Sequence, residues 1–231
     1  MSSGLGRPSW SVGLAALVGG LVVVTGVYAR VAGLGARPLA VDEYYFLQGV
    51  VSILDGGLPE LPGGGLYVRG MLIQYLTAGV IRITGDELAG LRLPSVVFGL
   101  LATVATWLLA RQWTGRWGAF ALSCVVLLSS WEIEFSRFGR MYAGFQLVSL
   151  VFLVVYTRAV RDGRSGTLWA LPPLCLAAVL CHFTALFFLP LLFVPFVTGD
   201  PTRNERPPAS YAFVAVVVAA VSVGLERFDF R

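Results

Sequence analysis

Two adjacent carboxylates are the first residues in this sequence that could do chemistry. Asp42 and Glu43 lie in the stretch Val41-Asp42-Glu43-Tyr44-Tyr45-Phe46, just after the first long hydrophobic segment. A carboxylate in this position can act as a general base or bind a cation. It can also be structural, because an Asp at the start of a helix accepts backbone N–H groups as an N-cap. The sequence leaves both roles open for Asp42, which we prefer over Glu43 as the base.

Four arginines are expected at helix ends on the same side of the protein as the acidic pair. Guanidinium groups match the geometry of phosphate oxygens, so these side chains could together form a phosphate clamp. Any one of them could instead anchor a helix end at the membrane surface. The four residues are Arg69, Arg92, Arg137 and Arg140. Arg137 and Arg140 are three positions apart and would share a face if they lay on a helix.

His182 is the only histidine and lies between two apolar stretches. An ionisable side chain at membrane depth is a candidate functional residue. The alternative is a histidine that is hydrogen-bonded for structural reasons. Tyr67 and Tyr142, which accompany the arginines in sequence, complete the set of candidate site residues.

The elements that must position these residues are hydrophobic helices. The chain of 231 residues is 57% hydrophobic and 13% charged, whereas soluble domains carry about 25% charged residues. Runs such as Val12–Val31 approach the ~20 apolar residues that cross a bilayer. The composition therefore predicts an all-α polytopic membrane protein. The net charge of +4 does not indicate nucleic acid as a partner, because the arginines are scattered between the hydrophobic runs.

About seven transmembrane helices are expected, in a single module that covers residues 1–231. Residues 12–34 form the first, which is too long for the core of a signal peptide. Residues 35–90 form an outer loop with two short helices, Glu43–Leu54 and Gly70–Ile83, that lie in the membrane interface. The six further spans fall within residues 91–225. They are Leu91–Ala110, Trp117–Trp131, Met141–Thr157, two from Leu168–Val197 divided near Cys181–Thr184, and Tyr211–Leu225.

The distribution of charge predicts how the module is oriented. Arginines gather in the turns at residues 111–116, 158–166 and 198–210, while the alternate segments hold most of the acids. Basic loops stay in the cytoplasm, so the amino terminus is predicted to be cytoplasmic. The Asp42 loop, the Glu132–Arg140 bend and His182 then lie on the outer side. The sequence thus predicts an integral protein of the cell membrane with its active site outside.

Several motifs, in order from about Arg37 to Pro190, resemble the C-type (GT-C) membrane glycosyltransferases. The nearest branch contains the aminoarabinose transferases, the protein O-mannosyltransferases and the Rgt-type lipopolysaccharide sugar transferases. The motifs are Arg37-Pro38-Leu39 ahead of Asp42-Glu43, Tyr67-Val68-Arg69-Gly70, Arg92-Leu93-Pro94-Ser95, and Ser136-Arg137 followed by Arg140-Met141-Tyr142. The resemblance is specific for the superfamily and not for a substrate.

The resemblance implies an enzyme that transfers a sugar from a polyprenyl-phosphate donor to a lipid, glycan or protein acceptor. Asp42 or Glu43 stands where the family has its catalytic acid, and Arg69 where a basic residue contacts the donor phosphate. Arg92 corresponds to the arginine that opens the second span. Attack opposite the leaving phosphate implies inversion at the anomeric carbon.

The chain also departs from the family pattern. Val68 stands where some relatives have an acid or a histidine, and Gly70 where they have proline, so the metal requirement stays open, including a divalent cation near Asp42. Family members usually continue beyond one module, so the chain is interpreted as a fragment or a minimal protein. The alternatives are a membrane transporter or lipid flippase and a non-catalytic assembly subunit. A transporter is disfavoured because the charges cluster at one face and no inverted repeat is visible.

Overall fold

The computed structural model describes residues 9–161 and 165–197, together with the single residues 211, 216, 217, 220 and 224. This described part is helical, apart from one isolated antiparallel bridge between Glu60 and Leu66. Its elements are α1 (Ser9–Val31), α2 (Val41–Gly56), α3 (Met71–Thr84), α4 (Glu87–Leu128), α5 (Ser130–Ser136), α6 (Tyr142–Arg161), α7 (Ser165–Leu168), α8 (Leu171–Cys181), η1 (Phe183–Phe188) and α9 (Leu189–Val197). The predicted all-α fold is confirmed for these residues.

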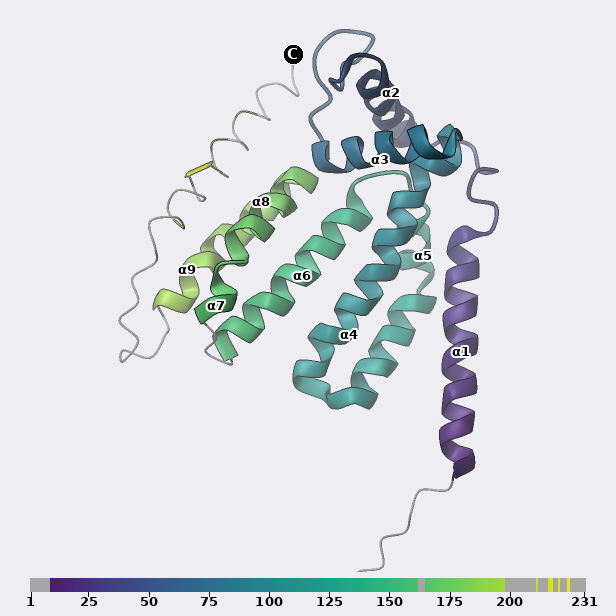
Figure 1. Ribbon diagram of the computed structural model, residues 1–231, viewed down its shortest axis with the longest axis vertical. Helices are drawn as coiled ribbons and strands as arrows, with labels where there is room; N and C mark the ends of the chain where they lie inside the picture. The colour runs from purple at the N-terminus through teal and green to yellow at the C-terminus, as the bar shows by residue number, and fades with distance from the viewer. Residues whose placement is uncertain are drawn as a thin grey trace, which may run out of the picture.

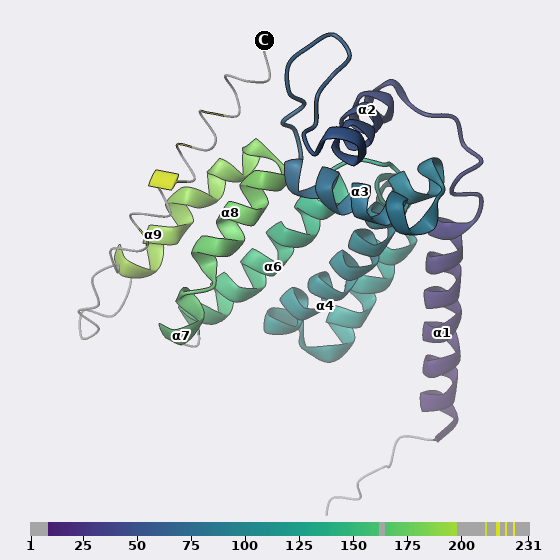
Figure 2. The ribbon, with the colours of Figure 1, turned by 45° about the horizontal axis from the view of Figure 1, so that its top comes forward.

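Most of the long helices stand side by side, and two helices lie across one end of the bundle (Figure 1). α4 packs against α1 and α6, and α6 packs against α8. α2 and α3 pack on each other over the end where α4 begins, which we call the capped end. The loop that joins α2 to α3 rises beyond both helices (Figure 2). Helices that lie across a bundle in this way fit the predicted interfacial helices, whose depth in a membrane stays a prediction.

The longest helix turns back on itself at Gly115. This residue has φ 68° and ψ −174°, a conformation that glycine adopts at little cost. The two limbs of α4 therefore form a hairpin (Figure 1), at the basic turn expected over Arg111–Arg116.

The number of membrane spans is confirmed only in part. Among the described residues, α4 and α6 are long and apolar enough to cross a membrane by length and composition. The predicted count of about seven is not confirmed. The expected span Tyr211–Leu225 and the basic loop at residues 198–210 lie outside the described residues, apart from single positions.

The predicted break near Cys181–Thr184 is present. α8 ends at Cys181, His182 is extended, and η1 and α9 follow. The Nδ1 atom of His182 accepts the backbone N–H of Thr184 at 3.3 Å, which caps the next helical segment.

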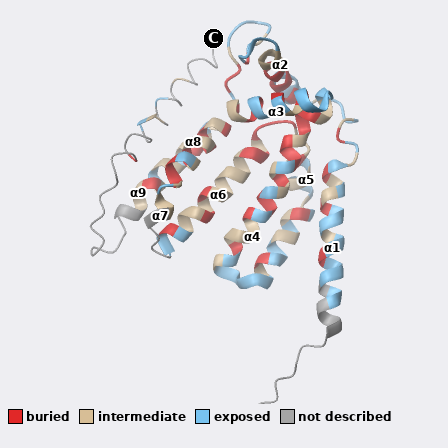
Figure 3. Cartoon of the chain, in the orientation of Figure 1, coloured by how far each residue is buried: buried red, intermediate tan, exposed pale blue. Residues whose placement is uncertain are grey.

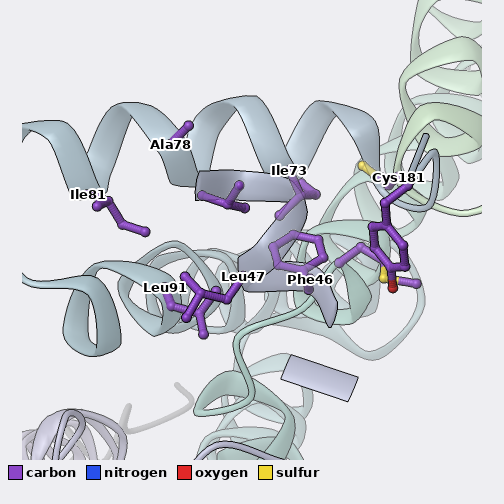
Figure 4. Packing of buried hydrophobic residues seen from close by; sticks show 10 residues of the cluster. Phe46, Leu47, Ile73, Ala78, Ile81, Leu91 and Cys181 are labelled. Carbon is purple, nitrogen blue, oxygen red and sulfur yellow. The ribbon is translucent and has the colours of Figure 1, made fainter. Parts of the chain in front are cut away.

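A buried apolar core joins α2 and α3 to the rest of the bundle (Figure 4). Phe46 of α2, Ile73 of α3 and Leu91 of α4 are each at most 2% exposed, and Cys181 contributes from the end of α8. Burying a side chain of this size stabilises a fold by about 1.5–3 kcal/mol. This core fixes α2 over the bundle, while α1 leaves much of its apolar surface exposed (Figure 3), as expected for a lipid-facing helix.

Candidate active site

Segments that are distant in the sequence meet at the capped end. The start of α2 lies against the bend that joins α5 to α6. Arg140 in that bend forms an ion pair with Asp42, with 2.7 Å between Nη1 and Oδ2. The neighbouring N–H of Gly139 donates to Oε1 of Glu43 at 2.7 Å. The predicted convergence of the acidic pair with Arg140 is therefore present in the structure.

Glu43 is buried, and both of its carboxylate oxygens are engaged inside the protein. Oε1 accepts from Nε of Arg92 at 2.9 Å as well as from Gly139, and Oε2 accepts from Nη2 of Arg92 at 2.8 Å. Oε2 also accepts the N–H of Ala40 at 3.1 Å, and Ala40 is the N-cap of α2. The side chain of Glu43 therefore binds the backbone of the N-cap residue, which is Ala40. The interpretation of Asp42 as the N-cap residue is wrong.

The pKa of Glu43 follows from these contacts. Burial opposes ionisation of the carboxyl group. The hydrogen bonds from Arg92, Gly139 and Ala40, together with the charge of Arg92, outweigh that penalty and hold the pKa below its ordinary value. Glu43 is therefore an ionised, internally paired residue at neutral pH.

Arg92 is the buried partner of Glu43 and is 1% exposed. Nε and one Nη2 N–H bind Glu43, Nη1 donates to the carbonyls of Leu34 and Arg37, and Nη2 also donates to the carbonyl of Pro38. An arginine has five N–H donors, and all five are used. Arg92 thus ties the loop before α2 to the start of α4. Because this geometry leaves no N–H for a phosphate, we interpret Arg92 as a structural residue.

Arg137 and Arg140 have different targets, although they are three positions apart. α5 ends at Ser136, so the two residues lie in a bend and the helical spacing does not apply. Nη1 of Arg137 donates to the carbonyl of Ala29 at 2.6 Å, and Nη2 reaches that of Gly33 at 3.5 Å. These carbonyls lie at the carboxyl end of α1, where a cation is favourable. The expectation that Arg137 and Arg140 share a helix face is therefore wrong.

Asp42 and Arg140 form an ion pair whose two halves differ in exposure. The side chain of Asp42 is 59% exposed, whereas that of Arg140 is 4% exposed. Nη2 of Arg140 donates to the hydroxyl of Tyr67 at 2.9 Å, and its guanidinium carbon lies 5.4 Å from the ring centre of Tyr142. Within the described part of the chain, Nε of Arg140 is buried without a hydrogen-bond partner. The site thus pairs an accessible carboxylate with a fixed guanidinium that has a donor left to use.

The turn that carries Arg69 packs against the same bend. Gly70 has φ +66°, and a Cβ there would lie 2.7 Å from Cβ of Met141 and 3.5 Å from the carbonyl of Cys181. A glycine is therefore needed for this close approach. Arg69 itself is exposed. The turn brings Arg69 to the junction between the bend and the end of α8.

His182 lies beside the aromatic rings of the bend and of α6. Its ring centre is 6.0 Å from that of Tyr142 and 5.4 Å from that of Phe145. Burial lowers the pKa of His182, and the positive charges of Arg140 and Arg69 lower it further. The turn of Arg69 also lies beside His182, since a Cβ on Gly70 would be 3.5 Å from the carbonyl of Cys181.

We expect the pKa of His182 to lie below the value of 6.5 that is ordinary for histidine, because burial, and then the charges of Arg140 and Arg69, disfavour its cation. Replacing Arg69 by glutamine should raise the titration midpoint, since one of the two positive charges is lost. As the only histidine, it gives a single assignable imidazole signal in NMR of protein without a histidine tag. Arg137→Gln is the matched control and should leave the midpoint unchanged. An unchanged midpoint in Arg69→Gln would separate Arg69 from this site.

Two polar residues outside the predicted set also support the site. Gln74 of α3 binds the backbone of the turn that carries Arg69, and Oγ of Ser95 donates to the carbonyl of Arg140 at 3.1 Å. Gln74 is the only amide side chain in the apolar helix α3. That contrast is the sequence signal by which it could have been found, whereas the signal for Ser95 is its place in the Arg92-Leu93-Pro94-Ser95 motif.

An open groove of about 650 Å³ runs along another face of α2, between that helix and the loop that follows it. Tyr44, Gln48, Asp55 and Glu60 are among its lining residues, which include none of the candidate site residues. In the part of the chain that the structure describes, no three His, Cys, Asp or Glu side chains are grouped as metal ligands. The divalent cation near Asp42 stays a prediction.

Comparison with known proteins gives a family match. Residues 68–225 match the family model for dolichyl-phosphate-mannose-protein mannosyltransferase. No curated protein and no solved structure matches the chain. The matched range includes Arg69, Arg140 and His182, whereas Asp42 and Glu43 lie before it. Their link to the site comes from the contacts described above.

Proposed function

The chain belongs to the dolichyl-phosphate-mannose-protein mannosyltransferase family of the GT-C superfamily, and from this we propose that it transfers a sugar at the capped end of the bundle. The donor is a polyprenyl-phosphate sugar, as the family supports. The acceptor is a hydroxyl group of a lipid, glycan or protein. The observation that carries the proposal is the ion pair between exposed Asp42 and buried Arg140, whose Nε has no hydrogen-bond partner among the described residues.

Asp42 serves as the general base in this proposal. The acceptor oxygen attacks the anomeric carbon of the donor, and its proton passes to the carboxylate of Asp42. The bond between the anomeric carbon and the phosphate oxygen breaks, and polyprenyl phosphate leaves with the electron pair. Attack from the side opposite the phosphate inverts the anomeric configuration. Glu43, which is fully engaged with Arg92, positions α2 and does not receive the proton.

Arg140 and Arg69 bind the phosphate of the donor. Negative charge grows on the leaving phosphate, so donors that are already fixed in place stabilise the transition state more than the ground state. Arg140 is held in place by Asp42 and Tyr67, and in the described part of the chain its buried Nε is a hydrogen-bond donor without a partner. Arg69 is exposed and reaches the phosphate from the neighbouring turn. His182 is neutral here and offers a hydrogen bond without adding positive charge.

The capped end faces the outside of the cell in this proposal, and the amino terminus lies in the cytoplasm. Arg111 and Arg116 flank the α4 hairpin at the opposite end, and Arg158 and Arg161 lie at the end of α6. Arg161 donates to the carbonyl of Gln112, which brings the two basic segments together. The positive-inside rule assigns this basic end to the cytoplasm.

Purified protein in liposomes tests the function directly. With a labelled polyprenyl-phosphate sugar and an acceptor, we expect polyprenyl phosphate and a glycoside of inverted configuration. Movement of the intact donor across the membrane without cleavage would instead support a flippase. The absence of both transfer and movement would support a non-catalytic subunit.

Arg69→Gln should raise the KM for the donor by about 10–100-fold, because a hydrogen bond to a charged group contributes about 1.5–3 kcal/mol. Arg137→Gln is the matched control, since Arg137 binds carbonyls of α1 and not the site. The KM is measured by initial rates over a range of donor concentration. Equal values for wild type and Arg69→Gln would remove Arg69 from the phosphate site.

A further inference from the structure

Gln74 is a buried amide beneath the turn that carries Arg69. It lies in the first turn of α3 and is 0% exposed. Nε2 donates to the carbonyl of Tyr67 at 2.7 Å and to that of Arg69 at 2.9 Å. Both N–H groups of the Gln74 amide therefore bind the same turn. They fix the distance between the backbone carbonyls of Tyr67 and Arg69.

Both residues held in this way have side chains in the proposed site. The hydroxyl of Tyr67 accepts a hydrogen bond from Arg140, and the side chain of Arg69 is exposed beside the same bend. Gln74 thus holds the backbone of Arg69 itself and of the tyrosine that contacts Arg140. A shift of the turn would move Arg69 and loosen Arg140 together.

The amide is also fixed by its surroundings. A Cβ on Gly49 of α2 would lie 2.5 Å from Oε1 of Gln74, so the two helices are in close contact there. Within the described part of the chain, Oε1 is buried and has no hydrogen-bond partner. A buried acceptor without a partner is destabilising, because it has lost its hydrogen bonds to water and gained none in the protein. An apolar side chain of similar size would avoid that cost, so packing alone does not account for an amide at this position.

We propose that Gln74 is a positioning residue for the donor site, which sets the Tyr67–Arg69 turn so that the arginine of the turn reaches the donor phosphate. This inference rests on the proposed function for its kinetic consequences. Its structural content, the placement of Arg69 by Gln74, is independent of whether the donor is a sugar lipid.

The kinetic test is a double-mutant cycle between Gln74→Met and Arg69→Gln. Methionine keeps the length of the side chain but donates no hydrogen bond. Gln74→Met should raise the KM for the donor by about tenfold, since two neutral hydrogen bonds of ~0.5–1.5 kcal/mol each are lost. In the Arg69→Gln background the same change should alter KM less than about twofold, because the residue being positioned is absent.

Thr77→Val is the matched control for this cycle. Thr77 lies one turn further along α3, is 0% exposed, and within the described residues its Oγ1 also has no hydrogen-bond partner. Valine there removes a buried hydroxyl without breaking a contact to the turn, so KM should not change. An equal effect of Thr77→Val, or an effect of Gln74→Met that persists undiminished without Arg69, would overturn the proposal.

The NMR titration of His182 separates this inference from the function itself. Arg69 is one of the charges that lower the pKa of His182. Gln74→Met should therefore shift the midpoint in the same direction as Arg69→Gln, in protein that need not be active. A shift in an inactive protein would reject the proposed transfer and retain the positioning role. A wild-type midpoint in Gln74→Met, and in the equally uncharged Gln74→Leu as a second variant, would reject the positioning role.

Discussion

Replacing Asp42 by asparagine is expected to lower the rate of sugar transfer by about 10²–10⁴-fold, the usual contribution of a general base. Asparagine has nearly the same shape but cannot take a proton from the acceptor. The charge of the ion pair with Arg140 is lost as well, but the side chain of Asp42 is 59% exposed, and the amide oxygen of asparagine can still accept a hydrogen bond from Arg140. The protein should therefore fold, and the loss should appear in kcat at saturating donor.

Asp55→Asn is the matched control for this prediction. Asp55 lies at the other end of the same helix, is exposed, and lines the groove instead of the site. We expect wild-type kcat for this variant, and unchanged helical circular dichroism for both. Full activity of Asp42→Asn, in protein whose wild type transfers sugar, would exclude Asp42 as the base.

The convergence of the acidic pair with the arginines could be predicted from the sequence. Which of the two carboxylates is accessible and which is buried could not. Alternation of spans and turns places the Asp42 loop, the bend at Arg140 and His182 at one end, and the structure has them there. Which carboxylate is accessible depends on rotation: neighbours on a helix point about 100° apart. Glu43 therefore faces Arg92 in the interior while Asp42 faces outward. The sequence Asp42-Glu43 alone does not show which of the two side chains faces the interior.

The roles of the arginines depended on backbone details that the sequence does not display. Helical spacing predicted a shared face for Arg137 and Arg140, but α5 ends at Ser136, before either residue, so that rule does not apply. The Arg92-Leu93-Pro94-Ser95 motif is part of the resemblance to the family. All five N–H donors of Arg92, however, bind Glu43 or carbonyls of the loop before α2, and the positions of those carbonyls are defined only when the loop is folded. Periodicity locates a helix reliably, whereas the target of a long side chain depends on the loop that passes it.

The largest effect on stability is expected from Arg92→Met, which leaves Glu43 buried without its cation. Removing one partner of a buried ion pair typically costs about 3–5 kcal/mol, which is at the upper end for single substitutions. Three carbonyls of the loop before α2 lose their donor as well. Unfolding of the purified protein by denaturant, followed by circular dichroism, measures the loss. Arg37→Met is the control: the Arg37–Glu134 pair is exposed by 54% and 52%, so its loss should cost no more than about 1 kcal/mol.

The pH dependence of stability should change sign between wild type and this variant. In the wild type the pKa of Glu43 is lowered, so its contribution is complete above the unfolded-state pKa of glutamate and is lost as pH falls through the lower folded-state value. In Arg92→Met only the N–H groups of Gly139 and Ala40 still favour the carboxylate, so burial, the largest single influence on the pKa of Glu43, favours the neutral acid. Acidification toward pH ~5 should then recover part of the lost stability. If Arg92→Met is no less stable than Arg37→Met, and its stability falls with acid as the wild type's does, then the Glu43–Arg92 pair does not hold α2 in place, and the positioning of Asp42 must depend on the apolar core beneath it.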